Sequence, residues 1–183
     1  WLHSWNFDVS ISSVVLTGGY VFDIAPKTLE VSQPIDFPHY HHVEEVGIKC
    51  EFCHKTVKKE DFATIPKVET CKLCHSQKQT NSSREAVLRE KYVEPDRRIP
   101  WKQVYKVPPH VYFSHKRHIV AGKIECTTCH GPVPQQNHAL TKPLNEITME
   151  FCIDCHVEKK KEKPIRYEGK QFRPTEDCLK CHR

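Results

Sequence analysis

The chain has 183 residues and a formal net charge of +5, and 38% of its residues are hydrophobic, which corresponds to a mean hydropathy of −0.62. A chain this polar has little apolar side chain to bury against the entropy lost on folding, so we expect something besides side chains to fill its interior. The composition excludes a collagen, a coiled coil and a bundle of membrane-spanning helices.

Residues 1–36 form the first segment and contain no cysteine. Residues 8–16 alternate partly between apolar and polar side chains, a pattern that predicts an extended segment. The longest uncharged stretch of this segment, residues 9–22, is shorter than the roughly 20 apolar residues that a membrane-spanning helix needs. We expect residues 1–36 to be an extended segment that covers other parts of the chain or contacts a partner.

Residues 37–75 hold two CxxC pairs, and each pair is directly followed by His. The same motif occurs three more times, so every cysteine of the chain belongs to one of five CxxCH motifs. Three other uses of CxxC explain the pattern less well. A zinc ribbon binds one metal with two CxxC pairs and does not need a His after each, and a thioredoxin-like motif occurs only once in a chain. A disulfide scaffold does not require a His after each pair. A covalently bound c-type haem explains the whole motif, because two Cys form thioethers with one haem and the adjacent His binds its iron.

The sequence therefore predicts five covalently bound c-type haems. The thioether residues are Cys50, Cys53, Cys71, Cys74, Cys126, Cys129, Cys152, Cys155, Cys178 and Cys181. The proximal iron ligands are His54, His75, His130, His156 and His182. Five porphyrins would supply the apolar interior that the side chains lack. We expect a mostly irregular chain in which short α-helices carry the motifs around a haem-packed core.

Two segments read Phe-x-His-x-x-His, and each precedes a CxxCH motif by seven residues. This internal repeat predicts four distal iron ligands, which are His39, His42, His115 and His118. We expect His42 to serve the haem of Cys50 and Cys53, and His118 that of Cys126 and Cys129.

The fifth distal ligand stays open between His138 and the single methionine, Met149, with an open or otherwise ligated iron as a third possibility. We expect His3, His41 and His110 not to be ligands, although a shift of one residue would exchange His41 with His42.

The repeat divides the chain into a two-haem module at residues 37–75, a Pro-rich linker at residues 76–112 and a three-haem module at residues 113–183. Within the linker, residues 83–91 predict a short helix with Ser82 or Ser83 as its N-cap. Residues 157–174 carry seven Lys and Arg against three Glu. We expect this segment to be a loop that either docks an acidic redox partner or is simply solvated.

The basic charge does not predict nucleic-acid binding, because the propionates of five haems add roughly −10 and five oxidised iron centres about +5. Haem is attached to CxxCH outside the cytoplasm, so we expect an exported, periplasmic protein. Residues 1–183 show no export signal, and we expect one to lie outside this chain.

The Phe-x-His-x-x-His-x7-CxxCH units resemble the class III multihaem cytochromes c, whose haems are mostly bis-His and of low potential. Over residues 34–183 the chain is also similar to the pentahaem subunit of alternative complex III and to the related cytochrome subunit of quinone reductase complexes. The strings that carry this similarity are FPHYHHVEEVGIKCEFCH, IPKVETCKLCH, IPWKQVYKVPPHVYFSHKRHIVAGKIECTTCHGPV and ITMEFCIDCH. The resemblance includes the methionine before the fourth motif, which is Met149 here, whereas residues 1–36 do not match.

The resemblance implies a cytochrome on the periplasmic face of the inner membrane, beside an iron–sulfur/molybdopterin-like subunit and quinone-binding membrane subunits. It implies a relay of electrons between the quinone site and a soluble redox carrier. A freestanding periplasmic multihaem carrier is the alternative. A multihaem nitrite or hydroxylamine type of enzyme is a third hypothesis, but it needs an open iron position, and the sequence has no CxxCK motif. We expect an electron-transfer subunit that is not an enzyme by itself.

Overall fold

The computed structural model describes residues 30–182. The expected extended segment at residues 8–16 and the expectation for His3 lie outside the described residues. Among the described residues no helix is both long enough and apolar enough to cross a membrane.

The described chain is mostly irregular, with short helices and one small sheet, and this confirms the predicted fold class. Three of the helical segments are π-helical turns and one is a 3-10 turn. In chain order the elements are η1 (His41–Glu45), α1 (Cys50–Cys53), α2 (Val68–His75), α3 (Ser83–Leu88), η2 (Arg89–Val93), η3 (Arg117–Ala121), α4 (Cys126–His130), η4 (Val133–Gln135), α5 (Met149–Lys160), β1 (Ile165–Tyr167), β2 (Lys170–Phe172) and α6 (Cys178–Cys181). Each of the five CxxC pairs lies in one of the helices α1, α2, α4, α5 and α6.

Side chains cap α3, α5 and α6, which are too short to be stable by themselves. The hydroxyl of Ser82 accepts a hydrogen bond from the Arg84 amide at the start of α3, at 3.2 Å. Thr148 accepts one from the Phe151 amide at the start of α5, at 3.1 Å. These caps satisfy amides that have no partner inside the helix, which favours the observed start points.

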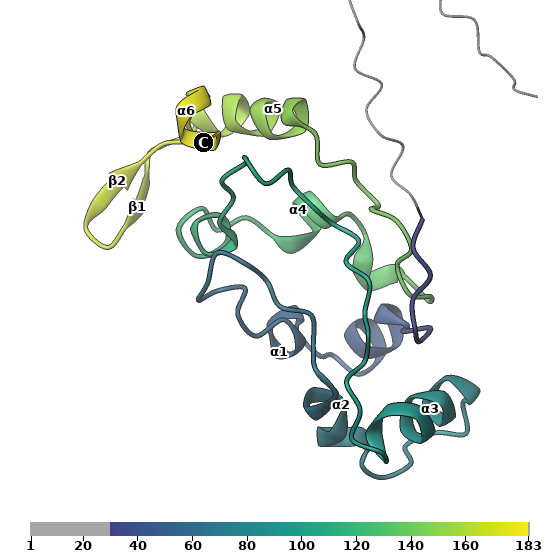
Figure 1. Ribbon diagram of the computed structural model, residues 1–183. Helices are drawn as coiled ribbons and strands as arrows, with labels where there is room; N and C mark the ends of the chain where they lie inside the picture. The colour runs from purple at the N-terminus through teal and green to yellow at the C-terminus, as the bar shows by residue number, and fades with distance from the viewer. Residues whose placement is uncertain (1–29, 183) are drawn as a thin grey trace, which may run out of the picture.

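The elements are arranged along an elongated molecule. Figure 1 shows α2 and α3 at one end, α5, α6 and the β1–β2 hairpin at the other, and α1 and α4 between them. The hairpin turns at Glu168 and Gly169, whose φ angles of 48° and 74° are both positive. A two-residue turn of this kind matches the twist of the flanking strands. The segment expected to be a loop at residues 157–174 therefore contains the end of α5 and this hairpin.

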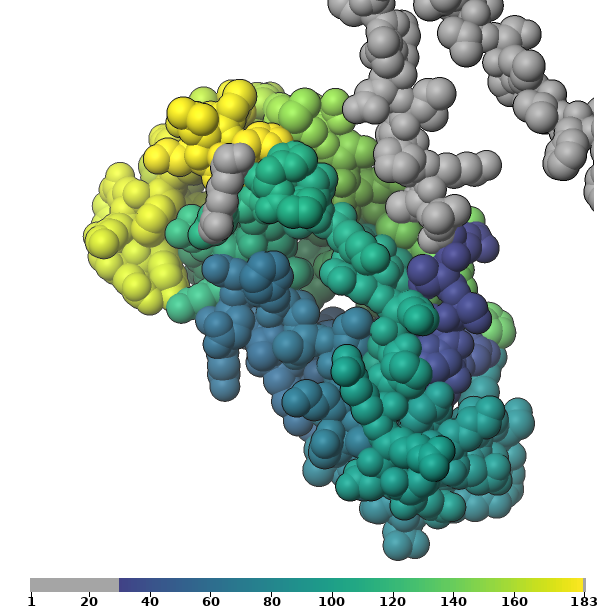
Figure 2. Space-filling model, viewed as in Figure 1, coloured from purple at the N-terminus to yellow at the C-terminus, as the bar shows by residue number. Residues whose placement is uncertain are grey.

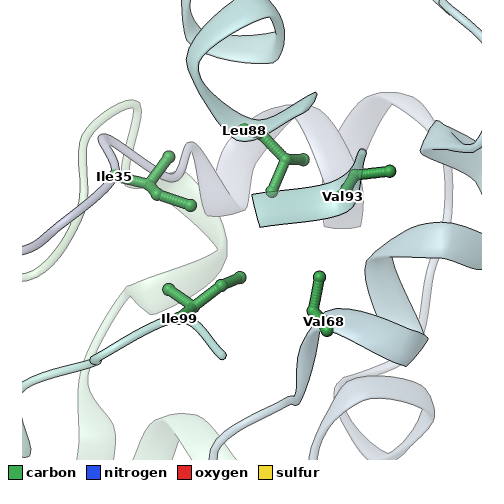
Figure 3. Packing of buried hydrophobic residues seen from close by; sticks show 5 residues of the cluster. All are labelled: Ile35, Val68, Leu88, Val93 and Ile99. Carbon is green, nitrogen blue, oxygen red and sulfur yellow. The ribbon is translucent and has the colours of Figure 1, made fainter. Parts of the chain in front are cut away.

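Within residues 30–182 most of the buried apolar side chains form a small cluster at the α2–α3 end. It consists of Ile35, Val68, Leu88, Val93 and Ile99 (Figure 3). Trp101 packs against it, and its indole N–H donates to the Pro66 carbonyl at 3.2 Å. The segment expected to be a Pro-rich linker thus supplies three of the five core residues.

Away from this cluster the chain leaves large apolar side chains exposed. Phe52, Leu73, Ile153 and Leu179 lie inside CxxC pairs, and Leu179 is 84% exposed. In the space-filling view an opening lies between the blue and teal segments near the middle of the molecule (Figure 2). The polypeptide therefore does not form an interior of its own in this region, as the low hydropathy predicts.

The sequence repeat is also a structural repeat. The π-helical turns η1 and η3 begin at the fifth residue of the two Phe-x-His-x-x-His segments, which is the same position in both. Five residues after the second His of each segment the backbone turns into the left-handed region, at Gly47 with φ of 78° and at Lys123 with φ of 52°. Equivalent hydrogen bonds close both turns, from Ile48 N–H to His42 C=O and from Ile124 N–H to His118 C=O.

Candidate haem sites

The five CxxCH motifs are numbered here as sites 1 to 5 in chain order. They comprise residues 50–54, 71–75, 126–130, 152–156 and 178–182. The two cysteines of each site are three residues apart on a helix, so both thiols lie on the same side of it. All ten cysteines are free of disulfide bonds, which leaves both thiols of every site available for thioethers.

The surroundings of the thiols do not favour zinc or redox chemistry. Burial raises the pKa of several thiols, including Cys53 and Cys129, and raises that of Cys71 to about 11. Redox-active and metal-binding cysteines have lowered pKa values instead. Within residues 30–182 no group of three or more His, Cys, Asp or Glu side chains is placed to hold a metal ion by itself.

The motif histidines of sites 2, 3 and 4 each face a second imidazole across a similar gap. The ring centres are 6.2 Å apart for His42 and His75, 6.3 Å for His115 and His130, and 6.1 Å for His118 and His156. A metal between two imidazoles, with metal–nitrogen bonds of about 2 Å on each side, places ring centres about 6 Å apart. These three pairs therefore fit an iron with two histidine ligands.

Sites 1 and 5 each have a second imidazole near the motif histidine. At site 1 this is the half-buried His39, and its partial burial, followed by the nearby charge of His54, lowers the pKa of His39 to about 4. Its Nδ1 atom is buried without a hydrogen-bond partner in the described part of the chain. At site 5 the ring of His182 stacks on that of His110 at 5.4 Å, which is closer than in the other pairs.

Hydrogen bonds orient six of these ten imidazoles through the Nδ1 atom. His54 donates to the Thr64 carbonyl at 2.9 Å, and His156 donates to the Thr175 carbonyl at 2.7 Å. His75 differs, because its partner is the carboxylate of Glu85 at 2.9 Å. The opposing rings of His42, His115 and His118 donate to the backbone carbonyls of Pro38, Asp61 and Ser114. Protonation at Nδ1 leaves the lone pair on Nε2, which is the usual arrangement of a metal-binding histidine.

The Phe of each repeat holds both of its histidines. Phe37 stacks on His42 with ring centres 4.4 Å apart and meets His39 edge-on at 4.9 Å. Phe113 stacks on His118 at 4.6 Å and meets His115 edge-on at 4.8 Å. Burial is also the largest cause of the lowered pKa values of His42, His115 and His118. The lowered pKa values favour the neutral form of these rings, which is the form that binds a metal.

The pairing of rings differs from the sequence expectation for two of them. His42 was expected to serve site 1 and His118 to serve site 3, but they face His75 of site 2 and His156 of site 4. In each repeat the first His lies near the next CxxCH motif, and the second faces the motif after that. The two rings of a repeat meet the same Phe in different ways, one edge-on and one stacked, so they are held in different directions and face different motifs.

The two candidates for the fifth distal ligand lie apart from the motif histidines. His138 is 74% exposed, and its Nδ1 atom lies 3.0 Å from Asp36 and 3.1 Å from the guanidinium of Arg84. Met149 begins α5 and is 57% exposed. His110, which was expected not to be a ligand, lies opposite His182, where backbone pairing of Val111 with His182 joins the two segments. His41 forms a hydrogen bond with Glu45.

The sites follow one another along the molecule in an order that differs from the order in the chain. The thiol of Cys53 influences that of Cys71, which links site 1 to site 2. The Cys50 thiol influences that of Cys126, which links site 3 to site 1. Thiols of site 4 influence Cys129 of site 3, and Cys181 of site 5 influences Cys152 of site 4. The resulting order 2–1–3–4–5 can be followed in Figure 1 through α2, α1, α4, α5 and α6.

Sequence reasoning did not identify two residues that contact the motif histidines. Tyr105 meets the ring of His130 edge-on at 4.4 Å and donates a hydrogen bond to the His130 carbonyl at 3.0 Å. Glu85 accepts the hydrogen bond of His75. Neither has a sequence signal, because each acts on a residue that is ten or more positions away in the chain.

Comparison with known proteins finds matches to two families of cytochromes c. Residues 22–99 match the class III cytochrome c family, and residues 111–183 match the family of cytochrome c7 and related cytochromes c. The chain is 28% identical over 186 residues to the multihaem cytochrome c subunit of menaquinone reductase from Nitratidesulfovibrio vulgaris. That alignment covers 96% of this chain and 79% of the relative.

Proposed function

We propose that this chain is a multihaem cytochrome c of the class III type and that it relays electrons within a quinone oxidoreductase complex of the bacterial inner membrane. The relay would join a quinone site to a soluble redox carrier on the periplasmic side. The relative from N. vulgaris supports this assignment, since its name describes a cytochrome subunit of a menaquinone reductase. The proposed partners are quinone-binding membrane subunits and an iron–sulfur/molybdopterin-like subunit.

The observation that carries the proposal is the row of opposed imidazoles. Haem iron supplies one-electron chemistry when it is bound, and its axial ligands and surroundings set its potential. We propose five c-type haems, one at each site, with the ten cysteines as thioether residues and the motif histidines as proximal ligands. The opposing imidazoles would be His39 at site 1, His42 at site 2, His115 at site 3, His118 at site 4 and His110 at site 5.

The polypeptide holds the sites close together and keeps each imidazole in place. Each Phe-x-His-x-x-His segment reaches two sites, so η1 joins sites 1 and 2, and η3 joins sites 3 and 4. Sites 1 and 3 meet where Cys50 approaches Cys126, which joins the proposed two-haem module at residues 37–75 to the three-haem module at residues 113–183. Sites 2 and 5 are the two ends of the row.

The Lys-rich segment gives no support to a freestanding carrier with a basic docking face. Three of its lysines pair with glutamates nearby, which are Lys159 with Glu162, Lys160 with Glu176 and Lys161 with Glu158. Exposed pairs of this kind reduce the net field that a partner would meet.

Purification from membranes in mild detergent tests the proposal. We expect other subunits to co-purify with the chain and the complex to oxidise or reduce a quinone analogue together with a soluble carrier. A chain that leaves the membrane in high salt, alone and with all of its haem, would contradict the relay within a complex and would support the freestanding carrier.

A further inference from the structure

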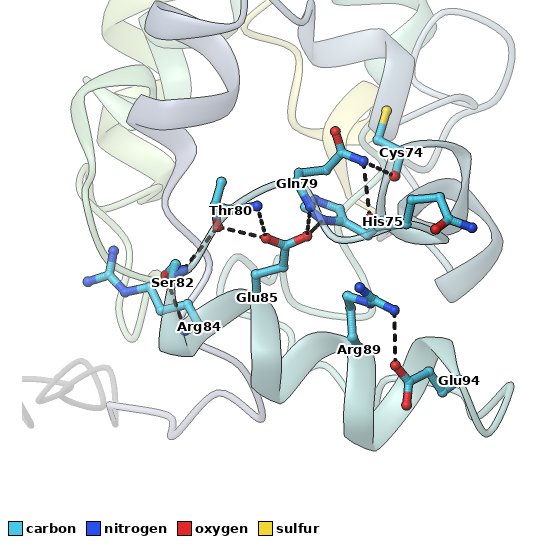
Figure 4. A network of polar contacts seen from close by, with 10 residues as sticks. Cys74, His75, Gln79, Thr80, Ser82, Arg84, Glu85, Arg89 and Glu94 are labelled. Atoms are coloured by element: carbon cyan, nitrogen blue, oxygen red, sulfur yellow. Dashed lines mark hydrogen bonds and ion pairs between the residues drawn. The ribbon is translucent and has the colours of Figure 1, made fainter.

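Glu85 is a buried carboxylate that lies against the motif histidine of site 2. Glu85 is 6% exposed, and its side chain projects from α3 toward the loop that follows α2 (Figure 4). One carboxylate oxygen accepts from His75 Nδ1 at 2.9 Å and from the Gln79 amide at 2.7 Å. The other accepts from the amide and the hydroxyl of Thr80, at 2.5 Å and 2.6 Å. All four partners donate, so the site is built for an ionised carboxylate.

Site 2 is unlike the other sites in this respect. The Nδ1 atoms of His54 and His156 donate to neutral backbone carbonyls. In the described part of the chain no other CxxCH histidine has a carboxylate as a hydrogen-bond partner. Site 2 also lies at one end of the row of sites, next to site 1.

A carboxylate at Nδ1 changes how the imidazole binds iron. The hydrogen bond pulls the Nδ1 proton toward Glu85, and this makes Nε2 a stronger donor to the metal. A stronger donor and a buried negative charge both stabilise the oxidised iron, which carries one more positive charge than the reduced iron. Four donors hold the Glu85 carboxylate in place, so its charge stays at a short and constant distance from the ring.

We propose that Glu85 is a positioning residue that makes site 2 the lowest-potential site of this chain, so that the row of sites has its low-potential end at α2. This inference rests on the proposed function, since it requires haem at the sites. It identifies the low-potential end of the row of sites, which the facing imidazoles alone do not identify.

Potentiometric titration of the haem-loaded full chain, followed by haem absorbance, tests the inference. In the Glu85→Gln variant we expect the lowest-potential component, about one fifth of the amplitude, to become about tenfold easier to reduce, a shift of about 59 mV upward for one electron. The other four fifths should keep their potentials. Glu94→Gln is the matched control, because Glu94 follows η2, pairs with Arg89 at 3.1 Å and is not bonded to His75 (Figure 4). Its titration curve should coincide with that of the unmodified chain.

A second variant decides the question if Glu85→Gln fails to load all of its haems. Thr80→Val removes the hydroxyl that donates to Glu85, so more of the carboxylate charge acts on His75 and the same component should move downward. Unchanged potentials in these variants, or a shift in any component other than the lowest, would overturn the inference. Failure of the unmodified chain to show five low-spin haems would overturn the proposed function as well, whereas five such haems with no effect of Glu85 would overturn this inference alone.

Discussion

Replacement of His110 by alanine separates the ligand set of the structure from that expected from the sequence. His110 stacks on His182 at 5.4 Å, so its loss should leave the iron of site 5 with one imidazole. One of five sites then changes, and about one fifth of the haem should convert from low spin to high spin by electron paramagnetic resonance. The thioethers do not depend on His110, so the intact mass should still show five haems per chain.

The two matched variants are His138→Ala and Met149→Ala, and both should leave every haem low spin. His138→Ala breaks an exposed ion pair with Asp36 and should reduce the free energy of unfolding by less than about 1 kcal/mol. A high-spin signal in either of these variants, together with an unchanged spectrum in His110→Ala, would refute the reasoning from opposed imidazoles.

Three further predictions follow from the same structure. His118→Ala should convert one haem to high spin, whereas in a chain whose Cys152 and Cys155 are replaced by alanine the same change should leave the remaining haems low spin; a high-spin haem in that chain would contradict the observed pairing with His156. Gly47 and Lys123 both have a positive φ, which only glycine adopts without strain. Measured by guanidinium unfolding, Gly47→Ala should lower the free energy of unfolding by about 1–2 kcal/mol, whereas Lys123→Gly should raise it by roughly 0.5–1 kcal/mol. Equal effects of the two variants would show that the positive φ does not cause strain at these positions. Burial alone would raise the pKa of Asp36, but hydrogen bonds from the Ala139 amide and His138 and the charge of Arg84 lower it overall. Ionised Asp36 therefore stabilises the fold at pH values above its ordinary pKa, and this contribution is lost as the pH falls through the lowered pKa. Asp36→Asn should make the free energy of unfolding fall less steeply at acid pH, and an unchanged acid dependence would contradict this assignment.

The candidate sites can be predicted from local patterns in the sequence, whereas their arrangement in space cannot. The five CxxCH motifs and the four histidines of the repeat are local patterns, because haem attachment needs residues a few positions apart. The contact of His110 with His182 joins residues far apart in the chain, and nothing in the Pro-Pro-His sequence around His110 indicates it. Each repeat has two histidines three residues apart, and the path of the chain after the repeat decides which CxxCH motif each of them faces. A local sequence pattern does not encode that path.

Glu85 shows why surrounding groups are harder to predict than ligands. It lies three residues after the N-cap Ser82, where a glutamate usually bonds back to the amide of the cap. In the structure it reaches further back, to the Gln79 and Thr80 amides and to His75. The hairpin at β1 and β2 was missed for a related reason, since strands of three residues are too short to show an alternating pattern.

The central claim is that this polypeptide folds around five haems that it holds through sulfur, each between two imidazoles. The intact mass of the purified chain after denaturation tests it most directly, because thioethers survive unfolding while ligated metals and loosely bound cofactors do not. The account predicts the 21.4 kDa polypeptide plus five haems. The mass of the bare polypeptide, with ten free thiols and no absorbance in the haem region, would contradict it.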